Sequence, residues 1–236
     1  MVDLKSLTKE ELAGMMDYSI LPKYTQEKEI REGCAVARKY RFAAFYSSSP
    51  YWTPIIAEEL QGYDDIEIGT GIAFPFGSAP ASVKSLEVEE AVKRGCTTVD
   101  MVMNIGALKD GRYNVVEDEL ELFVKAAENA VTKCILEVCY LTDEEIAVGS
   151  KLIEAAGIQY AKTSTGQFDG PSMEQFLVMR DTLAGTDVKM KVSGVKFPRP
   201  QNALAFIKAG AVRIGTRAAI EIVEAYDTMK SIGLIG

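Results

Sequence analysis

Three ionisable residues lie in runs of sequence that are otherwise typical of buried strands. Lys162 stands before a loop rich in hydroxyl groups and glycine, Lys191 precedes a Val-Ser-Gly turn, and Asp100 interrupts the apolar run 98–104. Burying a charged side chain is costly, because desolvation disfavours its charged form. A lone strand-end lysine usually reaches out to solvent, but three such residues in three apolar runs indicate one shared site.

The chemistry that such a site would support is Schiff-base catalysis. Two lysines held close together disfavour each other's charged form, which lowers a lysine pKa and frees a neutral amine. That amine attacks a carbonyl carbon, and the resulting iminium withdraws electrons while a carbon–carbon bond breaks or forms. Asp100, directly or through water, would move the protons. The competing interpretation is a structural lysine–aspartate salt bridge, which would leave the second lysine unpaired.

The sequence contains no histidine, which restricts the chemistry further. This removes the commonest general base, every Ser-His or Cys-His nucleophile and the commonest zinc ligand. Cys34, Cys96, Cys134 and Cys139 have neither metal-site nor disulfide-framework spacing. We therefore expect no metal and no cofactor, and proton transfer must use Lys, Asp, Glu, Tyr or water.

Composition and charge narrow the range of partners. The chain has 236 residues, of which 47% are hydrophobic, and a formal charge of −8. A negative chain disfavours nucleic acid and anionic membranes, since both reward clustered Lys and Arg. No apolar run is long enough for a membrane span, and residues 1–5 begin no signal peptide. Unpaired cysteines indicate a cytoplasmic protein, and a homo-oligomer is left open.

The elements that must position the three residues alternate regularly along the chain. We predict a short N-terminal helix from Thr8 through Met16 and strands at 17–21, 42–46, 66–73, 98–104 and 134–139, then one carrying Lys162, one carrying Lys191, and one at 212–215. The predicted helices between and after them span 26–40, 82–94, 115–131, 143–156, 201–209 and 218–232, with two more beginning at Pro50 and Ser172. Capping-box patterns mark the helix starts after Thr8, Thr142 and Ser172.

Strict alternation of strands and helices predicts a parallel sheet with crossover helices. Eight repeats in this length are typical of a (β/α)₈ (TIM) barrel, whose usual length is roughly 250 residues. We predict an α/β protein in which residues 1–236 form one such barrel. The alternative, an open doubly wound sheet, would usually show a glycine-rich turn after the first strand, where this chain has Pro22-Lys23-Tyr24.

In such a barrel, function lies at the C-terminal ends of the strands. Side chains two residues apart share a face of a strand. Thr98, Asp100 and Asn104 therefore share one face, as do Tyr160, Lys162 and Ser164, and as do Lys189, Lys191 and Ser193. If these are the inward faces, the charges of Asp100, Lys162 and Lys191 meet in the barrel mouth.

Six motifs, in order along nearly the whole chain, resemble the deoxyribose-phosphate aldolase family: Asp17 before Ile20-Leu21, Phe74–Gly77, Val99–Leu108, Ala161–Gly166, Lys191–Gly194 and Ala211–Thr216. The resemblance implies a class I aldolase that joins acetaldehyde reversibly to glyceraldehyde 3-phosphate, giving 2-deoxy-D-ribose 5-phosphate. It implies that Lys162 forms the Schiff base, Lys191 tunes its pKa and Asp100 relays protons. The predicted substrate-binding set is Asp17, Asn104, Thr163, Ser164, Gly166, Ser193, Gly194, Gly215, Thr216 and Arg217.

The sequence departs from this family mainly at the predicted phosphate site. The family has Gly-Gly followed by Arg after the seventh strand, where this chain has 194–199, Gly-Val-Lys-Phe-Pro-Arg, with spacing that suggests a one-residue insertion. After the eighth strand it has Arg217-Ala218 in place of a small residue and serine. Backbone N–H groups at glycine turns cradle phosphate in such barrels. Lys196, Arg199 or Arg217 could replace the lost cradle with charge, or could bind a carboxylate instead.

Further departures and candidates lie on other strands. Tyr18 stands where the family usually has His or Thr, and Phe45 where it often has Cys. The segment 46–52 could line the aldehyde pocket, although packing of an aromatic loop is the simpler interpretation. Glu137 could balance the two lysines or point between the barrel and a helix. Lys189 is expected at the solvated bottom of the barrel.

Three functions remain in competition at this point. The first is a Schiff-base aldolase acting on deoxyribose phosphate. The second keeps the lysine chemistry but uses another acceptor aldehyde, with or without phosphate. The third is a non-catalytic barrel that binds a small sugar or acid, for which two facing lysines have no purpose.

Overall fold

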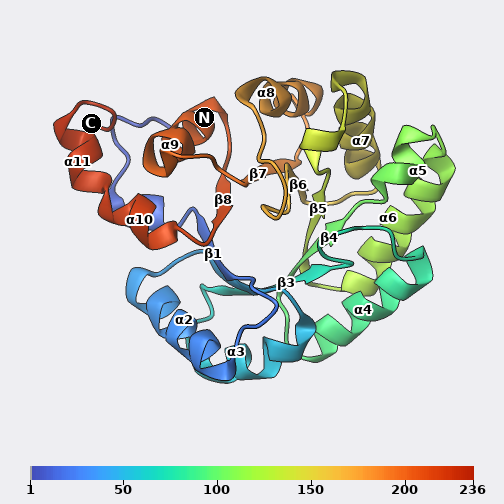
Figure 1. The fold of residues 1–236 in the computed structure, drawn as a ribbon, viewed down its shortest axis with the longest axis horizontal. Coiled ribbons are helices and arrows are strands. Elements are labelled where there is room, and N and C mark those ends of the chain that lie inside the picture. The colour runs from blue at the N-terminus through green and yellow to red at the C-terminus, as the bar shows by residue number, and fades with distance from the viewer. Residues whose placement is uncertain (1) are drawn as a thin grey trace.

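Eight parallel strands close into a barrel, with helices around its outside (Figure 1). The computed structural model describes residues 2–236. Each strand pairs with the next in the chain, and β8 pairs with β1 through Met16 and Ile214. This closure confirms the predicted (β/α)₈ barrel and excludes an open sheet. The strands are β1 (Met16–Ile20), β2 (Ala44–Ser47), β3 (Glu67–Ile72), β4 (Thr98–Val102), β5 (Val131–Ile135), β6 (Tyr160–Lys162), β7 (Lys189–Ser193) and β8 (Arg213–Thr216).

The helices follow one another around the strands in chain order (Figure 1). They are α1 (Lys9–Ala13), α2 (Glu27–Tyr40), α3 (Thr53–Glu59), α4 (Ala81–Lys93), α5 (Ile105–Lys109), α6 (Tyr113–Ala127), α7 (Asp143–Ala155), α8 (Met173–Thr182), α9 (Arg199–Ala209), α10 (Ala219–Glu224) and α11 (Tyr226–Ser231), with 3₁₀ turns η1 (Pro50–Trp52) and η2 (Val138–Tyr140). Among residues 2–236 no helix has both the length and the apolar composition that crossing a bilayer requires.

Local sequence signals account for several of these helix starts. The predicted capping boxes at Thr8, Thr142 and Ser172 are all present, with each hydroxyl accepting a hydrogen bond from the third residue of its helix.

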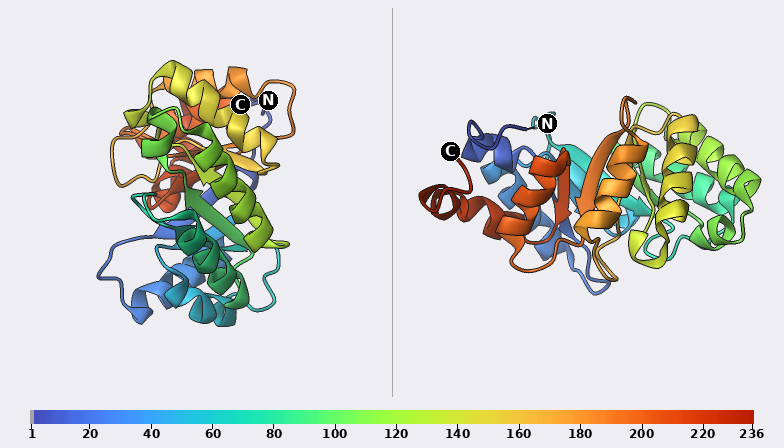
Figure 2. Two further views of the ribbon diagram at one scale, coloured as in Figure 1. Left: turned by 90° about the vertical axis from the view of Figure 1, so that its right-hand side faces the viewer. Right: turned by 90° about the horizontal axis from the view of Figure 1, so that it is seen from above.

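The two ends of the chain lie beside each other (Figure 2), where the Gly236 amide donates to the Leu4 carbonyl at 3.1 Å. Together with the pairing of β1 and β8, this contact joins the start of the barrel to its end.

The fifth strand differs from the prediction in its position. It spans Val131–Ile135, not 134–139, because α6 already ends at Ala127 and the Val131 amide donates to the Thr97 carbonyl of the neighbouring strand segment at 2.9 Å. Beyond the strand, Glu137 adopts a left-handed conformation (φ +51°), which turns the chain into η2. The apolar run 134–139 therefore holds the end of a strand and the start of a loop.

Several helix boundaries predicted from the sequence also differ from those in the structure. The first helix ends at Ala13, because Met16 already belongs to β1. Helix α5 was not predicted; Asn104 caps it, its side-chain oxygen accepting from the Ala107 amide at 3.1 Å. The single terminal helix predicted at 218–232 is divided at Ala225 into α10 and α11.

Candidate functional site

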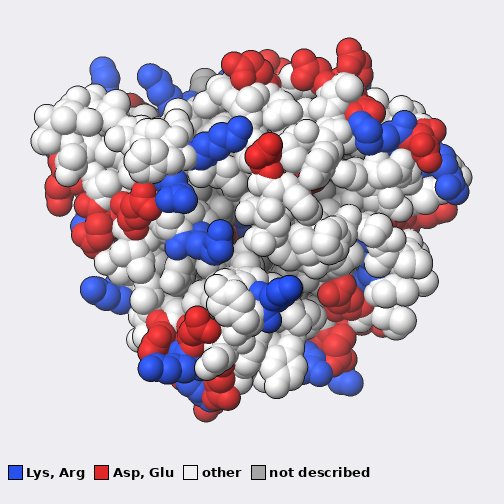
Figure 3. Space-filling model, viewed as in Figure 1, with Lys and Arg blue, Asp and Glu red and all other residues white. Residues whose placement is uncertain are grey.

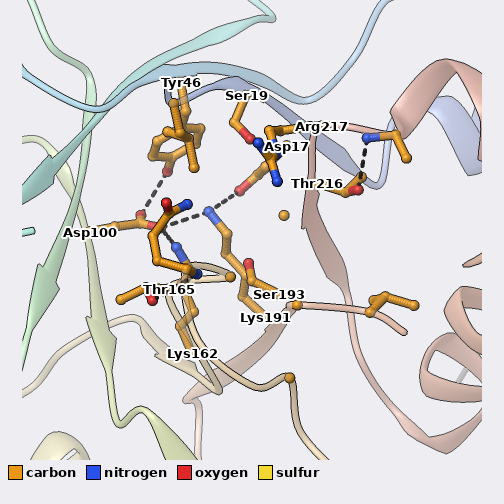
Figure 4. Close-up of a pocket in the computed structure, with 18 of the residues that line it drawn as sticks. Asp17, Ser19, Tyr46, Asp100, Lys162, Thr165, Lys191, Ser193, Thr216 and Arg217 are labelled. Atoms are coloured by element: carbon orange, nitrogen blue, oxygen red, sulfur yellow. Dashed lines mark hydrogen bonds and ion pairs between the residues drawn. The ribbon is translucent and has the colours of Figure 1, made fainter. Parts of the chain in front are cut away.

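The three ionisable residues singled out in the sequence meet inside the mouth of the barrel (Figure 4). Lys162 Nζ lies 2.6 Å and Lys191 Nζ 2.7 Å from the same oxygen, Oδ2 of Asp100. Strand register explains the meeting, because Lys162 on β6 pairs directly with Lys191 on β7. All three side chains are buried, and all three line a cavity of about 890 Å³.

The environment of Lys162 favours a neutral amine. Burial lowers the pKa of Lys162 most strongly, Lys191 lowers it further, and the attraction of Asp100 only partly opposes them. The pKa falls to about 8 as a result. About a tenth of Lys162 is therefore unprotonated at pH 7, far more than for an ordinary lysine, and nucleophilic attack on a carbonyl requires this form.

Asp100 responds to its neighbours in the opposite sense. Burial would raise the pKa of this carboxyl, but Lys162, Lys191 and Lys133 together outweigh burial and hold the pKa below its ordinary value. Asp100 is thus an ionised carboxylate that faces two amines. An anion in that position can accept a proton and return it.

The second lysine is not unpaired, contrary to the argument made against a purely structural salt bridge. Besides Asp100, Lys191 Nζ forms an ion pair with Asp17 Oδ2 at 2.6 Å. Asp17 on β1 is fully buried, and Lys133, Lys191 and Arg213 lower its pKa against the effect of burial. Lys191 is therefore held in place between two carboxylates, while Lys162 contacts one.

Sequence reasoning gave neither Lys133 nor Tyr46 a role in this network. Lys133 is fully buried on β5 and contacts Glu67 Oε2 at 2.7 Å and the Tyr46 hydroxyl at 2.9 Å. Tyr46 lines the cavity, and its hydroxyl donates to Asp100 Oδ1 at 2.8 Å. Lys133 was overlooked because the strand was predicted to start after it. Tyr46 ends the strand predicted at 42–46 and begins the segment 46–52, for which loop packing was the simpler interpretation and lining of the pocket the alternative. For Tyr46 the structure favours the alternative.

The predicted substrate-binding residues fall into two groups. Those that line the cavity are Asp17, Gly166, Ser193, Gly194, Gly215, Thr216 and Arg217. Three others do not line it. Asn104 caps α5, Thr163 Oγ1 accepts from the Ser193 amide at 3.1 Å, and Ser164 is buried without a side-chain hydrogen bond among residues 2–236.

Two of the lesser candidates lie away from the amines. The Glu137 carboxylate accepts from the Thr165 amide at 3.1 Å, so it supports the loop after β6 and makes no ion pair with either lysine. Lys189 is exposed at the start of β7.

Three cationic side chains line the outer part of the cavity, together with the carboxylates Asp169 and Glu221. The cationic residues are Lys196, Arg199 and Arg217, and Figure 3 shows lysine and arginine side chains beside a hollow near the centre of this face. Arg199 is neutralised by Glu221 at 3.2 Å. Lys196 and Arg217 are exposed and form no ion pair among residues 2–236. Two cations are therefore available to an anionic ligand.

Comparisons with known proteins find relatives over nearly the whole chain. No protein-family model matches the chain. A deoxyribose-phosphate aldolase of Exiguobacterium sp. is 40% identical over 214 residues, which cover 90% of this chain and 96% of that protein. One of Clostridium tetani is 38% identical over 216 residues, covering 91% and 98%. A solved structure, described as a unique tetrameric deoxyribose phosphate aldolase from Aeropyrum pernix, has a TM-score of 0.85 at 25% identity and covers 94% of this chain and 93% of that one.

Proposed function

The chain belongs to the deoxyribose-phosphate aldolase family and is a carbon–carbon lyase, and from that premise we propose how its residues cleave 2-deoxy-D-ribose 5-phosphate reversibly into acetaldehyde and glyceraldehyde 3-phosphate. The observation that carries the assignment of roles is the pair of buried lysines on one carboxylate oxygen, with the pKa of Lys162 at about 8. Lys162 is the nucleophile. Lys191 lowers the pKa of Lys162, and Asp100 moves protons.

Cleavage begins when the neutral Lys162 amine attacks the aldehyde carbon, C1, of the open-chain sugar. Loss of water gives an iminium, which draws electrons toward nitrogen. Removal of the proton from the C3 hydroxyl then breaks the C2–C3 bond, releasing glyceraldehyde 3-phosphate and leaving an enamine on Lys162. Protonation of the enamine at C2 and addition of water release acetaldehyde and restore the amine.

Asp100 is placed to handle the protons of these steps. As an ammonium, Lys162 donates to Asp100 Oδ2, but as an amine or iminium it carries fewer N–H hydrogens. Oδ2 then has capacity for another proton, taken directly or through water. Lys191, on the same oxygen, stays fixed by Asp17 while this occurs.

A trapping experiment tests the assignment of the nucleophile. Acetaldehyde with borohydride should give a reduced covalent adduct that mass mapping places on Lys162. Because attack needs the neutral amine and the pKa of Lys162 is lowered to about 8, the initial rate of adduct formation should rise about tenfold per pH unit below that value and level off above it. Mapping to Lys191, or a rate still rising steeply up to the ordinary lysine pKa, would contradict the assignment.

We propose that side-chain charge holds the phosphate of the acceptor. Gly194 keeps its left-handed conformation (φ +75°) in the turn after β7, but Val195 follows it where the family has a second glycine. Arg217 and Lys196 line the same part of the cavity without an ion-pair partner among the described residues. These observations support recognition of phosphate by Arg217 and Lys196 together with the backbone of the turn.

Replacing Arg217 or Lys196 with alanine should therefore weaken binding of the phosphorylated substrate. A hydrogen bond to a charged group contributes about 1.5–3 kcal/mol, so each Michaelis constant should rise roughly ten- to a hundredfold. Adduct formation with acetaldehyde, which has no phosphate, should be unchanged. Steady-state cleavage of 2-deoxy-D-ribose 5-phosphate measures the first effect, and borohydride trapping measures the second.

The control for these two variants is Arg94→Ala. Arg94 is an exposed arginine that pairs with Glu90 on α4 and does not line the cavity. If all three variants bind the phosphorylated substrate like the parent, side-chain recognition is wrong. The parent's preference for phosphorylated over unphosphorylated sugar then decides between a backbone cradle and the alternative of an acceptor without phosphate. The sequence left a homo-oligomer open. We propose one here because the Aeropyrum pernix relative is described as a tetramer.

A further inference from the structure

The Tyr46 hydroxyl on β2 donates a hydrogen bond to the catalytic carboxylate, and the mechanism above assigns Tyr46 no task (Figure 4). We propose that Tyr46 is a positioning residue: its hydroxyl occupies Oδ1 of Asp100, so that Oδ2 alone faces Lys162 and Lys191. The inference rests on the proposed Schiff-base function and adds to it the residue that orients the proton relay.

A glycine on the neighbouring strand provides the space that the Tyr46 ring occupies. Tyr46 pairs with Gly69 on β3, and a Cβ atom at Gly69 would overlap the Tyr46 ring. The ring therefore lies across the glycine and brings its hydroxyl past β3 to Asp100 on β4. A tyrosine at position 46 and a glycine at position 69 are thus two halves of one arrangement.

The direction of the hydrogen bond follows from the neighbours of the hydroxyl. Lys133 Nζ lies 2.9 Å from the phenol oxygen, and an ammonium can only donate, so the oxygen accepts there. The phenol hydrogen must then point to Asp100 Oδ1 at 2.8 Å or to Thr98 Oγ1 at 3.2 Å. The carboxylate is nearer and charged, and hydrogen bonds to charged acceptors are stronger.

Lys133 is itself held where this arrangement needs it. It contacts Glu67 at 2.7 Å and Asp17 at 3.5 Å. Burial would lower the pKa of Lys133, but the carboxylates of Asp17, Asp100 and Glu67 outweigh it and raise the pKa. Lys133 thus remains a donor, which keeps the Tyr46 hydrogen directed to Asp100.

Tyr46 is suited to remain a donor as well. Burial, and then the charge of Asp100, raise the pKa of its phenol well above the ordinary value. Its ring also lies over Lys191, whose Nζ is 4.0 Å from the ring centroid, within the range of a cation–π contact. One side chain therefore touches both the carboxylate and the second lysine.

Several charged and titratable groups surround Tyr46 and Asp100. They come from every strand except β2 and are Asp17, Glu67, Asp100, Lys133, Tyr160, Lys162, Lys191 and Arg213. Of these, only Asp100 both accepts from the Tyr46 hydroxyl and contacts Lys162. Loss of the hydroxyl therefore reaches Lys162 through Asp100.

Loss of the Tyr46 hydroxyl should make Lys162 hold its proton up to a higher pH. A hydrogen bond to Oδ1 draws negative charge away from Oδ2. Without it, Oδ2 holds the proton of Lys162 more strongly, and the neutral amine appears only at higher pH. Attack on a carbonyl near neutral pH should then slow.

The experiment compares Tyr46→Phe with the parent by borohydride trapping of acetaldehyde at a series of pH values. Tyr46→Phe keeps the ring over Gly69 and Lys191 and removes only the hydroxyl. We expect the midpoint of the pH–rate curve to move upward and the rate near pH 7 to fall roughly three- to tenfold, since only part of a charge-assisted hydrogen bond is transmitted to the lysine. The rate on the high-pH plateau should stay close to the parent's.

Tyr160→Phe is the matched control. Tyr160 is a second buried barrel tyrosine with its ring 5.0 Å from Lys133 Nζ, and none of the hydrogen bonds of Asp100 within residues 2–236 comes from it. Tyr160→Phe also removes a phenol hydroxyl, but the midpoint of its pH–rate curve should equal the parent's. A general effect of losing a barrel hydroxyl would instead shift both variants alike, and would overturn the proposal.

A second substitution keeps the test decisive if Tyr46→Phe does not fold. Placing 3-fluorotyrosine at position 46 makes the phenol more acidic and a stronger donor at nearly the same volume, so the midpoint should move downward. An unchanged midpoint in either protein overturns the role of Tyr46. If the parent itself forms no adduct at Lys162, the proposed function has failed, and that outcome is visible before any variant is compared.

Discussion

Replacing Lys162 with alanine is expected to reduce cleavage of 2-deoxy-D-ribose 5-phosphate by on the order of 10⁴-fold or more, because the variant has no amine at the end of β6 to form the Schiff base. Lys191 cannot take over readily, since its Nζ is held between Asp17 and Asp100. The measurement is steady-state cleavage together with borohydride trapping, which should no longer yield an adduct.

Lys189→Ala provides the matched control for this variant. Lys189 lies on β7, two residues before Lys191, but it is exposed at the start of the strand. Its replacement should leave turnover and trapping close to the parent's. Activity of Lys162→Ala within tenfold of the parent would show that the carbon–carbon bond is broken without a Schiff base at this position.

The parts of this molecule that could be predicted from sequence are those encoded by local patterns. Alternating strands and helices predicted the barrel, and the alternation of side chains showed that Asp100, Lys162 and Lys191 would meet if their faces pointed inward. Each of these residues lies in a short apolar run, so a charge there stands out without knowledge of its neighbours. Closure of the barrel then brings them together.

Lys133 and Tyr46 could not be predicted in the same way. Lys133 lies between the helix predicted at 115–131 and the strand predicted at 134–139, and the apolar run after it continues past the true end of β5 into η2. The contact of Tyr46 with Asp100 depends on the register of Tyr46 with Gly69, which is a relation between strands and leaves no local pattern. Register between parallel strands is set by the whole barrel.

In the loops after β7 and β8, the sequence could not predict which cations are paired. The sequence identified Lys196, Arg199 and Arg217 as alternative sources of positive charge, and only the spatial arrangement distinguishes them. Glu221 neutralises Arg199, whereas Lys196 and Arg217 have no such partner among residues 2–236. An ion pair between the start of α9 and α10 depends on how two loops are folded, so residue types alone cannot reveal it.

Asp100→Asn should separate formation of the Schiff base from the proton transfers that follow it. The amide keeps the shape of the carboxylate but carries no charge and is a poor base, so turnover should fall about 10²- to 10⁴-fold. Asp100 raises the pKa of Lys162, and without that charge the pKa should drop below about 8. Trapping with acetaldehyde near neutral pH should therefore be as fast as in the parent, or faster, while cleavage is slow.

The same substitution should also destabilise the fold, and this effect needs its own control. Removing one partner of a buried ion pair costs about 3–5 kcal/mol, and Lys162 can reduce that cost only by losing its proton. Glu119→Gln removes another buried carboxylate, which pairs with Lys84 at 2.7 Å between α4 and α6 and does not line the cavity. Denaturant unfolding should show a loss of stability in both variants, but only Asp100→Asn should lower the ratio of the cleavage rate to the trapping rate. If Glu119→Gln lowers that ratio equally, the effect at Asp100 reflects stability, and the carboxylate has no separate part in moving protons.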